Sequence, residues 1–182
     1  MKKSKFKGFT LIELIVVIAI ISILTLLIVP NWMHSIHKSR VSEQNGKARV
    51  VFNAAQSAAQ DFMFKERIQK PAAGKGVGNK GFVLYWNSAT QTARGFSVSG
   101  GTKTSVDNAV AEEFASSINH IFSDFENTTY GIYINNYIVE DVACGASDSP
   151  NYLGSFPEKQ TERNNSSQSI SGYVYGAANV TP

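Results

Sequence analysis

The sequence predicts an α+β protein, in which a long N-terminal helix packs against a C-terminal antiparallel β-sheet head that carries an extra helix. Three observations predict this class: an apolar run over residues 9–29, a helical apolar stripe that follows it, and strand and helix patterns after residue 80. With 182 residues, the chain is long enough for one compact domain and an appendage. We expect four segments, namely a basic N-terminal segment at 1–8, an apolar helix at 9–29, its continuation at 30–70, and a globular head at 71–182.

The apolar run at 9–29 contains one ionisable side chain, Glu13. As an α-helix its 21 residues span about 31 Å, which is close to the hydrocarbon thickness of a bilayer. An ordinary secretory signal has a shorter apolar region that ends in small residues, and no such ending surrounds Val29. Four lysines precede the apolar run: Lys2, Lys3, Lys5 and Lys7. Because basic residues are retained in the cytoplasm, the N-terminus is predicted to lie inside and the rest of the chain outside.

Glu13 argues against a plain membrane anchor. A carboxylate in hydrocarbon costs a few kcal/mol at mid-bilayer, and less near one end of the span. We therefore expect a partner that neutralises Glu13. The alternative is a simple anchor whose glutamate reaches the lipid headgroups.

Residues 7–14, Lys-Gly-Phe-Thr-Leu-Ile-Glu-Leu, and the apolar run that follows them to Pro30 resemble the processing and assembly motif of type IV prepilins and pseudopilins. The resemblance implies that a prepilin peptidase removes residues 1–8 by cutting after Gly8 and methylates the new amine of Phe9. It also implies that Glu13 of one subunit pairs with the Phe9 amine of a neighbour. The implied partners are other pilins in a homo- or hetero-oligomeric filament, the peptidase and N-methyltransferase, an inner-membrane assembly platform and the lipid bilayer.

From this resemblance we expect a structural subunit of a type IV pilus-like filament, which serves adhesion, motility or DNA uptake. The precursor would be a single-pass protein of the cytoplasmic membrane, and the assembled subunit would lie in a cell-surface filament. The alternative is a pseudopilin of a type II secretion-like export machine. A third class, a membrane-anchored enzyme or binding protein, predicts that residues 1–8 are retained.

The long helix is predicted to continue to about residue 69, with a mild interruption near Asn45-Gly46. Its apolar positions recur in steps of mostly three or four: Ile36, Val41, Ala48, Val51, Phe52, Ala55, Ala59 and Phe62. Pro30 predicts a kink around residues 26–30. Ser22 and Thr25 are expected to bond back to carbonyls of their own helix rather than to serve, with Ala19, as a close-packing face.

Several elements are predicted for the head. A glycine-rich loop at 71–81 precedes a strand pair at Phe82–Trp86 and Gly95–Val98. A helix fits Asp107 to about Phe125, with Asp107 or Asn108 as its cap, and its predicted apolar face comprises Val110, Phe114, Ile118, Ile121, Phe122 and Phe125. A second hairpin fits Tyr130–Val142 with a turn near Asn135-Asn136, and Ser169–Tyr175 is a further strand candidate.

Composition gives no evidence for a nucleic-acid partner. The formal charge of +3 includes the four lysines before Gly8, and their removal leaves 13 basic against 14 acidic residues. A second group of basic side chains follows the apolar run: Lys38, Arg40, Lys47 and Arg49. The default expectation is that they form a solvated or salt-bridged helix face, and contacts with anionic lipid or DNA are the alternatives.

The sequence indicates neither catalysis nor a cofactor. His34 and His37 share one helix face but lack an evident third metal ligand. Glu112-Glu113 and His120 lie near the predicted head helix without a nucleophile that would complete a catalytic set. Cys144 is the sole cysteine, so no intramolecular disulfide forms, and we expect its thiol to be buried.

Overall fold

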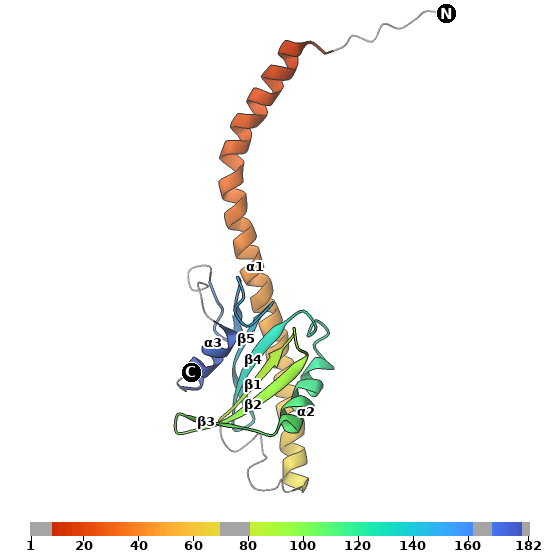
Figure 1. Cartoon of the computed structure of the whole chain (residues 1–182), viewed down its shortest axis with the longest axis vertical. Helices are drawn as coiled ribbons and strands as arrows, with labels where there is room; N and C mark the ends of the chain where they lie inside the picture. The colour runs from red at the N-terminus through yellow and green to blue at the C-terminus, as the bar shows by residue number, and fades with distance from the viewer. Residues whose placement is uncertain (1–8, 70–80, 162–168, 180–182) are drawn as a thin grey trace, which may run out of the picture. The chain divides into compact units, whose positions relative to one another are not determined.

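The structure of the chain, a computed structural model, describes residues 9–69, 81–161 and 169–179, without the side chains of residues 26–31 and 66–69 (Figure 1). It comprises two units, Met1–Lys38 and Ser39–Pro182, which we call the first and second units. Helix α1 (Leu11–Gln69) contributes to both. The second unit adds a six-stranded antiparallel sheet and two shorter helices, so the predicted α+β class is confirmed.

In the first unit, the apolar side chains from Phe9, just before α1, to Leu24 of α1 are largely exposed. The hydroxyl groups of Ser22 and Thr25 donate hydrogen bonds of 2.7 Å to the carbonyls of Ile18 and Ile21, which confirms that they bond back to their own helix. No helix among the described residues is both long and apolar enough to qualify as a membrane span. The kink predicted at Pro30 falls outside the residues whose side chains are described.

In the second unit, the strands lie in the order β3-β2-β1-β4-β5-β6. Both predicted hairpins are confirmed: β1 (Gly81–Asn87) pairs with β2 (Thr92–Ser99), and β4 (Thr129–Asn135) pairs with β5 (Ile138–Gly145). The turn of the second hairpin places Asn136 and Tyr137 at positive φ. The sequence did not predict two short strands, β3 (Thr102–Ser105) and β6 (Gly154–Phe156). The glycine-rich loop predicted at 71–81 lies largely outside the described residues.

The first face of the sheet packs against two helices. Alternate β1 residues Phe82 and Leu84 join buried side chains of α1 and of α2 (Asn108–Asn119) in one core. Within this core, the rings of Phe62 and Phe114 meet edge to face at 5.0 Å. The part of α1 that belongs to the second unit is therefore the helix segment against which this face of the sheet packs.

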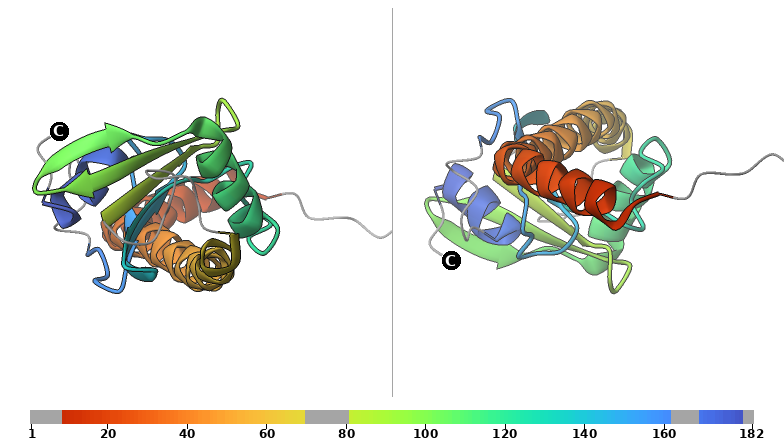
Figure 2. Two further views of the ribbon diagram at one scale, coloured as in Figure 1. Left: turned by 90° about the horizontal axis from the view of Figure 1, so that it is seen from below. Right: turned by 90° about the horizontal axis from the view of Figure 1, so that it is seen from above.

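The opposite face of the sheet packs against α3 (Ile170–Ala177). Val83 of β1 and Ala143 of β5 contribute to a second core with Ile170 and Val174 of this helix. In both views of Figure 2, α2 and α3 lie on opposite sides of the strands. The sheet is thus covered on both faces.

Helix α3 corrects the predicted strand at Ser169–Tyr175. Its aromatic and β-branched residues are typical of a strand, but Ser169 caps a helix by accepting a 2.9 Å hydrogen bond from the Gly172 amide. Ile170 and Val174, four residues apart, lie on one helix face and are both buried. Tertiary burial at helical spacing therefore outweighs the local strand propensity.

Two predicted details of the other helices are also wrong. Helix α2, capped by Asp107 as predicted, ends at Asn119 rather than near Phe125, because the chain turns and Trp86 Nε1 donates to the Phe125 carbonyl at 3.0 Å. Helix α1 passes through Asn45-Gly46 without the predicted interruption. The Asn45 side chain makes tertiary hydrogen bonds that favour this helical position despite its low propensity.

Asn45 fastens the segment after β5 to α1. Its Oδ1 accepts hydrogen bonds from the amides of Ser155 (2.9 Å) and Gln160 (3.2 Å), and its Nδ2 donates to the Gln160 carbonyl at 2.9 Å. At Gly154, the neighbouring backbone comes so close to α1 that a Cβ would overlap the backbone of Gln44 and Asn45. These contacts hold the segment from Gly154 to Gln160 against α1. Hydrogen bonds and close packing do this without a disulfide, because the lone cysteine of the chain is free.

Candidate functional site

The candidate site lies at the start of α1. Gly8 is outside the described residues, while Phe9 precedes the helix with its side chain 87% exposed. The Thr10 carbonyl accepts the first helical hydrogen bond, from Leu14 at 3.3 Å. Thr10 is therefore the residue that caps the helix, and it directly follows the amine that cleavage after Gly8 would create.

Thr10 and Glu13 bond to each other reciprocally. The Glu13 Oε2 atom accepts hydrogen bonds from the Thr10 amide at 2.9 Å and from the Thr10 hydroxyl at 2.7 Å, while the Glu13 amide donates to Thr10 Oγ1 at 3.4 Å. This arrangement is a capping box. It holds the carboxylate at the first turn of the helix, where the unpaired backbone amides also favour a negative charge.

The capping box leaves acceptor capacity on the carboxylate. Within the described part of the chain, the hydrogen bonds that Glu13 receives all end at Oε2. An ionised carboxylate has about four lone-pair sites, so Oε1 can accept from a further donor. The site can therefore hold a cation such as an amine while Thr10 fixes the orientation of Glu13.

The helix surface beyond Glu13 is apolar and exposed. From Leu14 to Leu24, its large apolar residues have exposed fractions between 46% at Ile15 and 63% at Ile23, without a charged face to interrupt them. Exposed apolar surfaces of this extent mark sites of interaction with protein or membrane. The carboxylate and the apolar surface together form one candidate interaction site.

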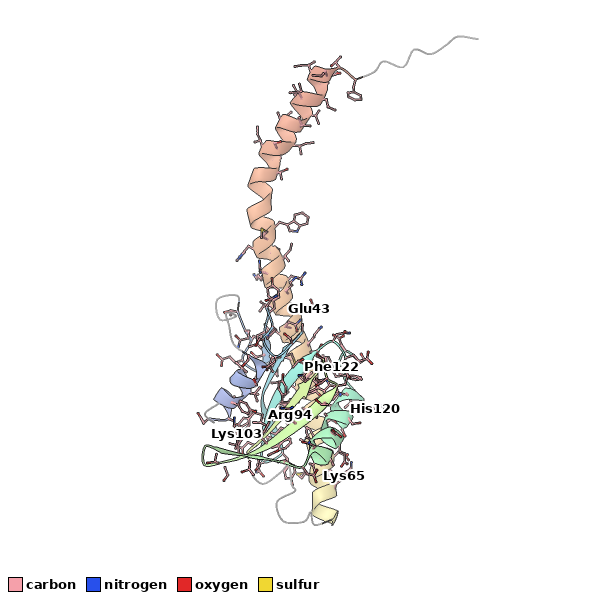
Figure 3. All side chains as sticks on the ribbon, in the orientation of Figure 1. Glu43, Lys65, Arg94, Lys103, His120 and Phe122 are labelled. Carbon is pink, nitrogen blue, oxygen red and sulfur yellow. The ribbon has the colours of Figure 1, made fainter. Side chains whose placement is uncertain are left out.

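The structure does not bring the other sequence candidates together. Glu113 lies 3.2 Å from Lys65 of α1, and His120 is exposed beyond the end of α2 (Figure 3). No group of three or more His, Cys, Asp or Glu side chains among the described residues could hold a metal ion, and the pair His34 and His37 belongs to none. Burial raises the pKa of the Cys144 thiol, because a thiolate would lose its hydration in this core.

One of the basic residues after the apolar run has acidic partners, as expected by default. The Lys47 ammonium lies 2.7 Å from Asp124 and 3.6 Å from Glu43. Partial burial, the largest single influence, lowers the pKa of Lys47, but the hydrogen bonds and charges of Asp124 and Glu43 together raise it above its ordinary value. Lys47 therefore joins α1 to the segment that follows α2.

The comparisons with known proteins address this N-terminal site. Residues 3–29 match the family model for the prokaryotic N-terminal methylation motif. This match supports the resemblance of the N-terminus to type IV pilin-like proteins. The matched residues include Gly8, Phe9 and Glu13, whose individual roles in cleavage, methylation and pairing stay predictions. The pilin-like motif implies processing by a prepilin peptidase and assembly with pilin subunits. No curated protein and no solved structure matches the chain.

Sequence reasoning missed Thr10 as a site residue. The signal was present, because Thr-x-x-Glu before an apolar run is the sequence pattern of a capping box. The pattern overlaps the residues that carry the family resemblance. The capping role of Thr10 was therefore readable from the pattern, whereas the contact distances required the structure.

Proposed function

We propose that this chain is a structural subunit of a type IV pilus-like filament, cut after Gly8, methylated on Phe9 and assembled by packing of its N-terminal helix. The observation that carries the proposal is the Glu13 carboxylate, fixed by Thr10 at the first turn of an otherwise apolar, exposed helix surface. Burial of that surface against other helices would also bury the carboxylate. A partner of opposite charge is then needed.

The Phe9 amine of a neighbouring subunit is the partner we propose for Glu13. Either charge alone would be costly in an apolar surrounding, while the pair compensates for the lost hydration of both. Because each subunit has one such amine and one such carboxylate, the pairing would also set the register of neighbouring helices along the filament. Glu13 thus contributes mainly to the specificity of assembly.

Before assembly, residues 9–29 are proposed to hold the precursor in the cytoplasmic membrane with residues 1–8 inside. The peptidase would act there, and an inner-membrane assembly platform would receive the mature subunit. Once in the filament, the second unit would face the cell exterior, where adhesion, motility or DNA uptake are the tasks that such filaments serve. The apolar helix would exchange lipid contacts for contacts with other helices.

Isolation of filaments sheared from cells that express the chain tests this function. Imaging together with mass spectrometry is expected to show the chain as the principal subunit of surface filaments. The methylation motif is equally compatible with a pseudopilin of a secretion machine. A chain that is processed but scarce in the sheared material would favour the pseudopilin, and recovery of unprocessed chain in the membrane alone would contradict both.

A further inference from the structure

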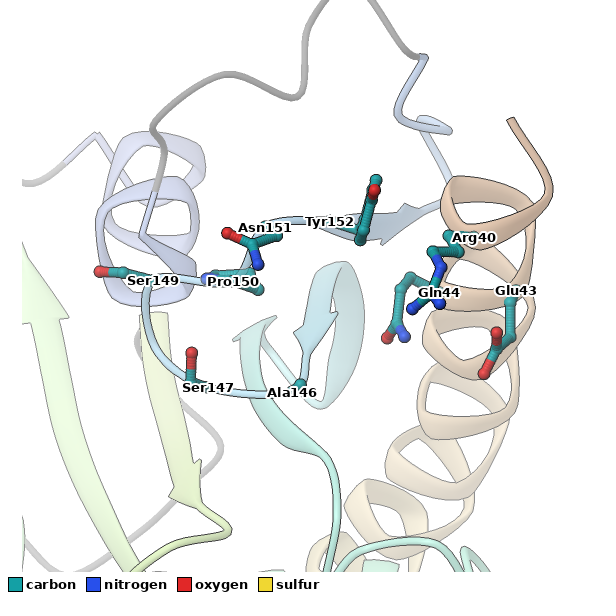
Figure 4. A pocket seen from close by; sticks show the side chains of 9 residues that line it. All are labelled: Arg40, Glu43, Gln44, Ala146, Ser147, Ser149, Pro150, Asn151 and Tyr152. Carbon is teal, nitrogen blue, oxygen red and sulfur yellow. The ribbon is translucent and has the colours of Figure 1, made fainter. Parts of the chain in front are cut away.

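The second unit contains a polar cleft beside α1 that the filament function does not use. It has a volume of about 270 Å³, with one wall formed by Arg40, Glu43 and Gln44 of α1. The other wall is the loop between β5 and β6, from Ala146 to Tyr152. Figure 4 shows the side chains of both walls around this space.

The loop wall is held in place by contacts on both sides of the cleft. Where it begins, Gly145 packs so tightly on Pro150 that a Cβ would lie 2.5 Å from the proline Cγ. In its middle, the Asp148 carboxylate accepts a 3.1 Å hydrogen bond from the Ser171 amide of α3. After it ends, Asn45 bonds to the Ser155 amide. The cleft is therefore formed before any ligand arrives, which lowers the entropy cost of binding.

The cleft presents one positive charge, one negative charge and several neutral polar groups. The Arg40 guanidinium lies 5.8 Å from the centre of the Tyr152 ring, and none of the ion pairs found among the described residues engages it. Ser147, Ser149 and Asn151 line the opposite wall. On α1, Gln44 Oε1 is buried without a hydrogen-bond donor, and a donor supplied by a ligand would satisfy it.

The geometry points to a binding site for a small hydroxylated carboxylate, of the size and chemistry of a uronate sugar. Arg40 would bind the carboxylate through paired N–H donors, the geometry in which guanidinium groups recognise carboxylates. The serine hydroxyls and the carboxamides would exchange hydrogen bonds with the ligand's hydroxyl groups. Tyr152 would keep the Arg40 side chain in position beneath the carboxylate.

Size and charge separate this ligand from other anions. The volume of the cleft lies just below the usual range of about 300–1,000 Å³ for drug-sized ligands, which suits a single sugar ring. Glu43, on the same helix wall, bears a negative charge that repels a dianionic phosphate more strongly than a singly charged carboxylate, and Glu43 can accept a hydrogen bond from a sugar hydroxyl. A singly charged, hydroxyl-rich ligand matches both charges of the cleft. The inference does not depend on the filament function.

The test uses the full chain in a mild detergent and ligand-observed saturation-transfer NMR. D-Glucuronate is the probe and D-glucose is the neutral sugar control; inorganic phosphate, which has no observable proton, is the anion control and is tested as a competitor of glucuronate. Glucuronate is expected to bind at least about tenfold more tightly than either control, because it alone combines a carboxylate for Arg40 with hydroxyl groups for the polar side chains. Absence of glucuronate binding, or equal binding of glucose or phosphate, would overturn the inference.

Arg40→Gln should reduce glucuronate affinity by about tenfold or more, since it removes the charge and leaves a side chain that can still form hydrogen bonds. Arg49→Gln is the matched control, because Arg49 is an exposed arginine on α1 that does not line the cleft. Both variants should show the wild-type thermal transition. Equal glucuronate binding by the two variants would place the ligand elsewhere and overturn the assignment.

The same measurement distinguishes a free sugar from the end of a glycan. An oligosaccharide that ends in glucuronate should bind at least as tightly as the monosaccharide if the cleft recognises glycan termini. Preference for the monosaccharide would instead assign the cleft to a free sugar acid. Either preference supports the site, provided that Arg40→Gln weakens binding of the preferred ligand by about tenfold or more and Arg49→Gln does not.

Discussion

The two units place the apolar side chains of one helix in opposite environments. In the first unit, Ile15 is 46% exposed and Phe9 is 87% exposed, whereas in the second unit Val51 and Ala55 are fully buried under the sheet. The second half of α1 is covered by the sheet of its own unit, whereas the large apolar side chains described for the first half are exposed. The comparison teaches that the second unit buries its apolar helix face internally, while the exposed apolar surface of the first unit supports the external partner proposed above.

The largest effect is expected from Gly8→Val, which tests whether the first unit must be processed. A side chain at this position should obstruct the close approach of a protease to the backbone, so full-length precursor should accumulate. Immunoblots and intact mass measurements would show the retained residues 1–8. Gly46→Val is the matched control, because a Cβ at Gly46 meets no neighbour within 4 Å. Normal processing of Gly8→Val would remove the proposed cleavage point.

Glu13→Ala should be processed normally but should reduce the filament yield by about tenfold or more, because the neighbour's amine loses its counter-charge in an apolar surrounding. The readout is the amount of subunit in sheared filaments relative to the amount in membranes. Glu112→Ala, at an exposed glutamate of α2, is the control and should assemble like the wild type. Unchanged filament yield from Glu13→Ala would show that the pairing is not needed.

Gly154→Ala tests the claim that the second unit is held together from within. Its Cβ would overlap the α1 backbone, and overpacking of this kind costs about 1–3 kcal/mol, so the thermal transition of the full chain should fall by several degrees. Gly176→Ala is the control, since a Cβ at that α3 position meets open space and should leave the transition unchanged or slightly raised. If both variants melt like the wild type, the close contact between β6 and α1 is not important for stability.

The smallest effect concerns Asp141, whose pKa is raised to about 6, chiefly because burial disfavours the charged form. Since the unfolded carboxyl titrates near 4, the stabilising contribution of the protonated form is complete below about pH 4 and is lost as the pH rises through about 6. Asp141→Asn should therefore be more stable than the wild type above pH 6 and similar to it below pH 4.

Denaturation of the full chain at several pH values would measure this difference. It should stay below about 1 kcal/mol, because Asp141 is partly exposed and solvent screens its charge. Glu140→Gln, at the exposed neighbouring carboxyl, should retain the wild-type dependence on pH. A constant difference between Asp141→Asn and the wild type at every pH would contradict the raised pKa.

Local signals explain what the sequence predicted well. The hairpins of the sheet were readable because a short polar turn separates two apolar runs at Asn87–Arg94 and at Asn135-Asn136. The cap at Asp107 was readable from the residue type that caps helices. The N-terminal site was likewise contained in a few consecutive residues, so its residue types could be recognised before any contact was known.

Features that depend on distant contacts were not predictable. Strand β6 is three residues long and exists because it pairs with β5 and crosses α1 at Gly154. The strand pattern at Ser169–Tyr175 was misleading, because burial of Ile170 and Val174 on one face selects a helix. The cleft beside Arg40 is formed by residues 40–44 and 146–152, which lie far apart in the sequence, so no local sequence pattern predicts it.

The central claim is that the first unit is a processed assembly helix, and mass spectrometry of the N-terminal peptide of the protein recovered from its host tests it most directly. The account predicts a mature chain that begins at Phe9 and carries one methyl group on its amine. A chain that retains Met1 to Gly8 would contradict it and would favour a permanently anchored protein instead.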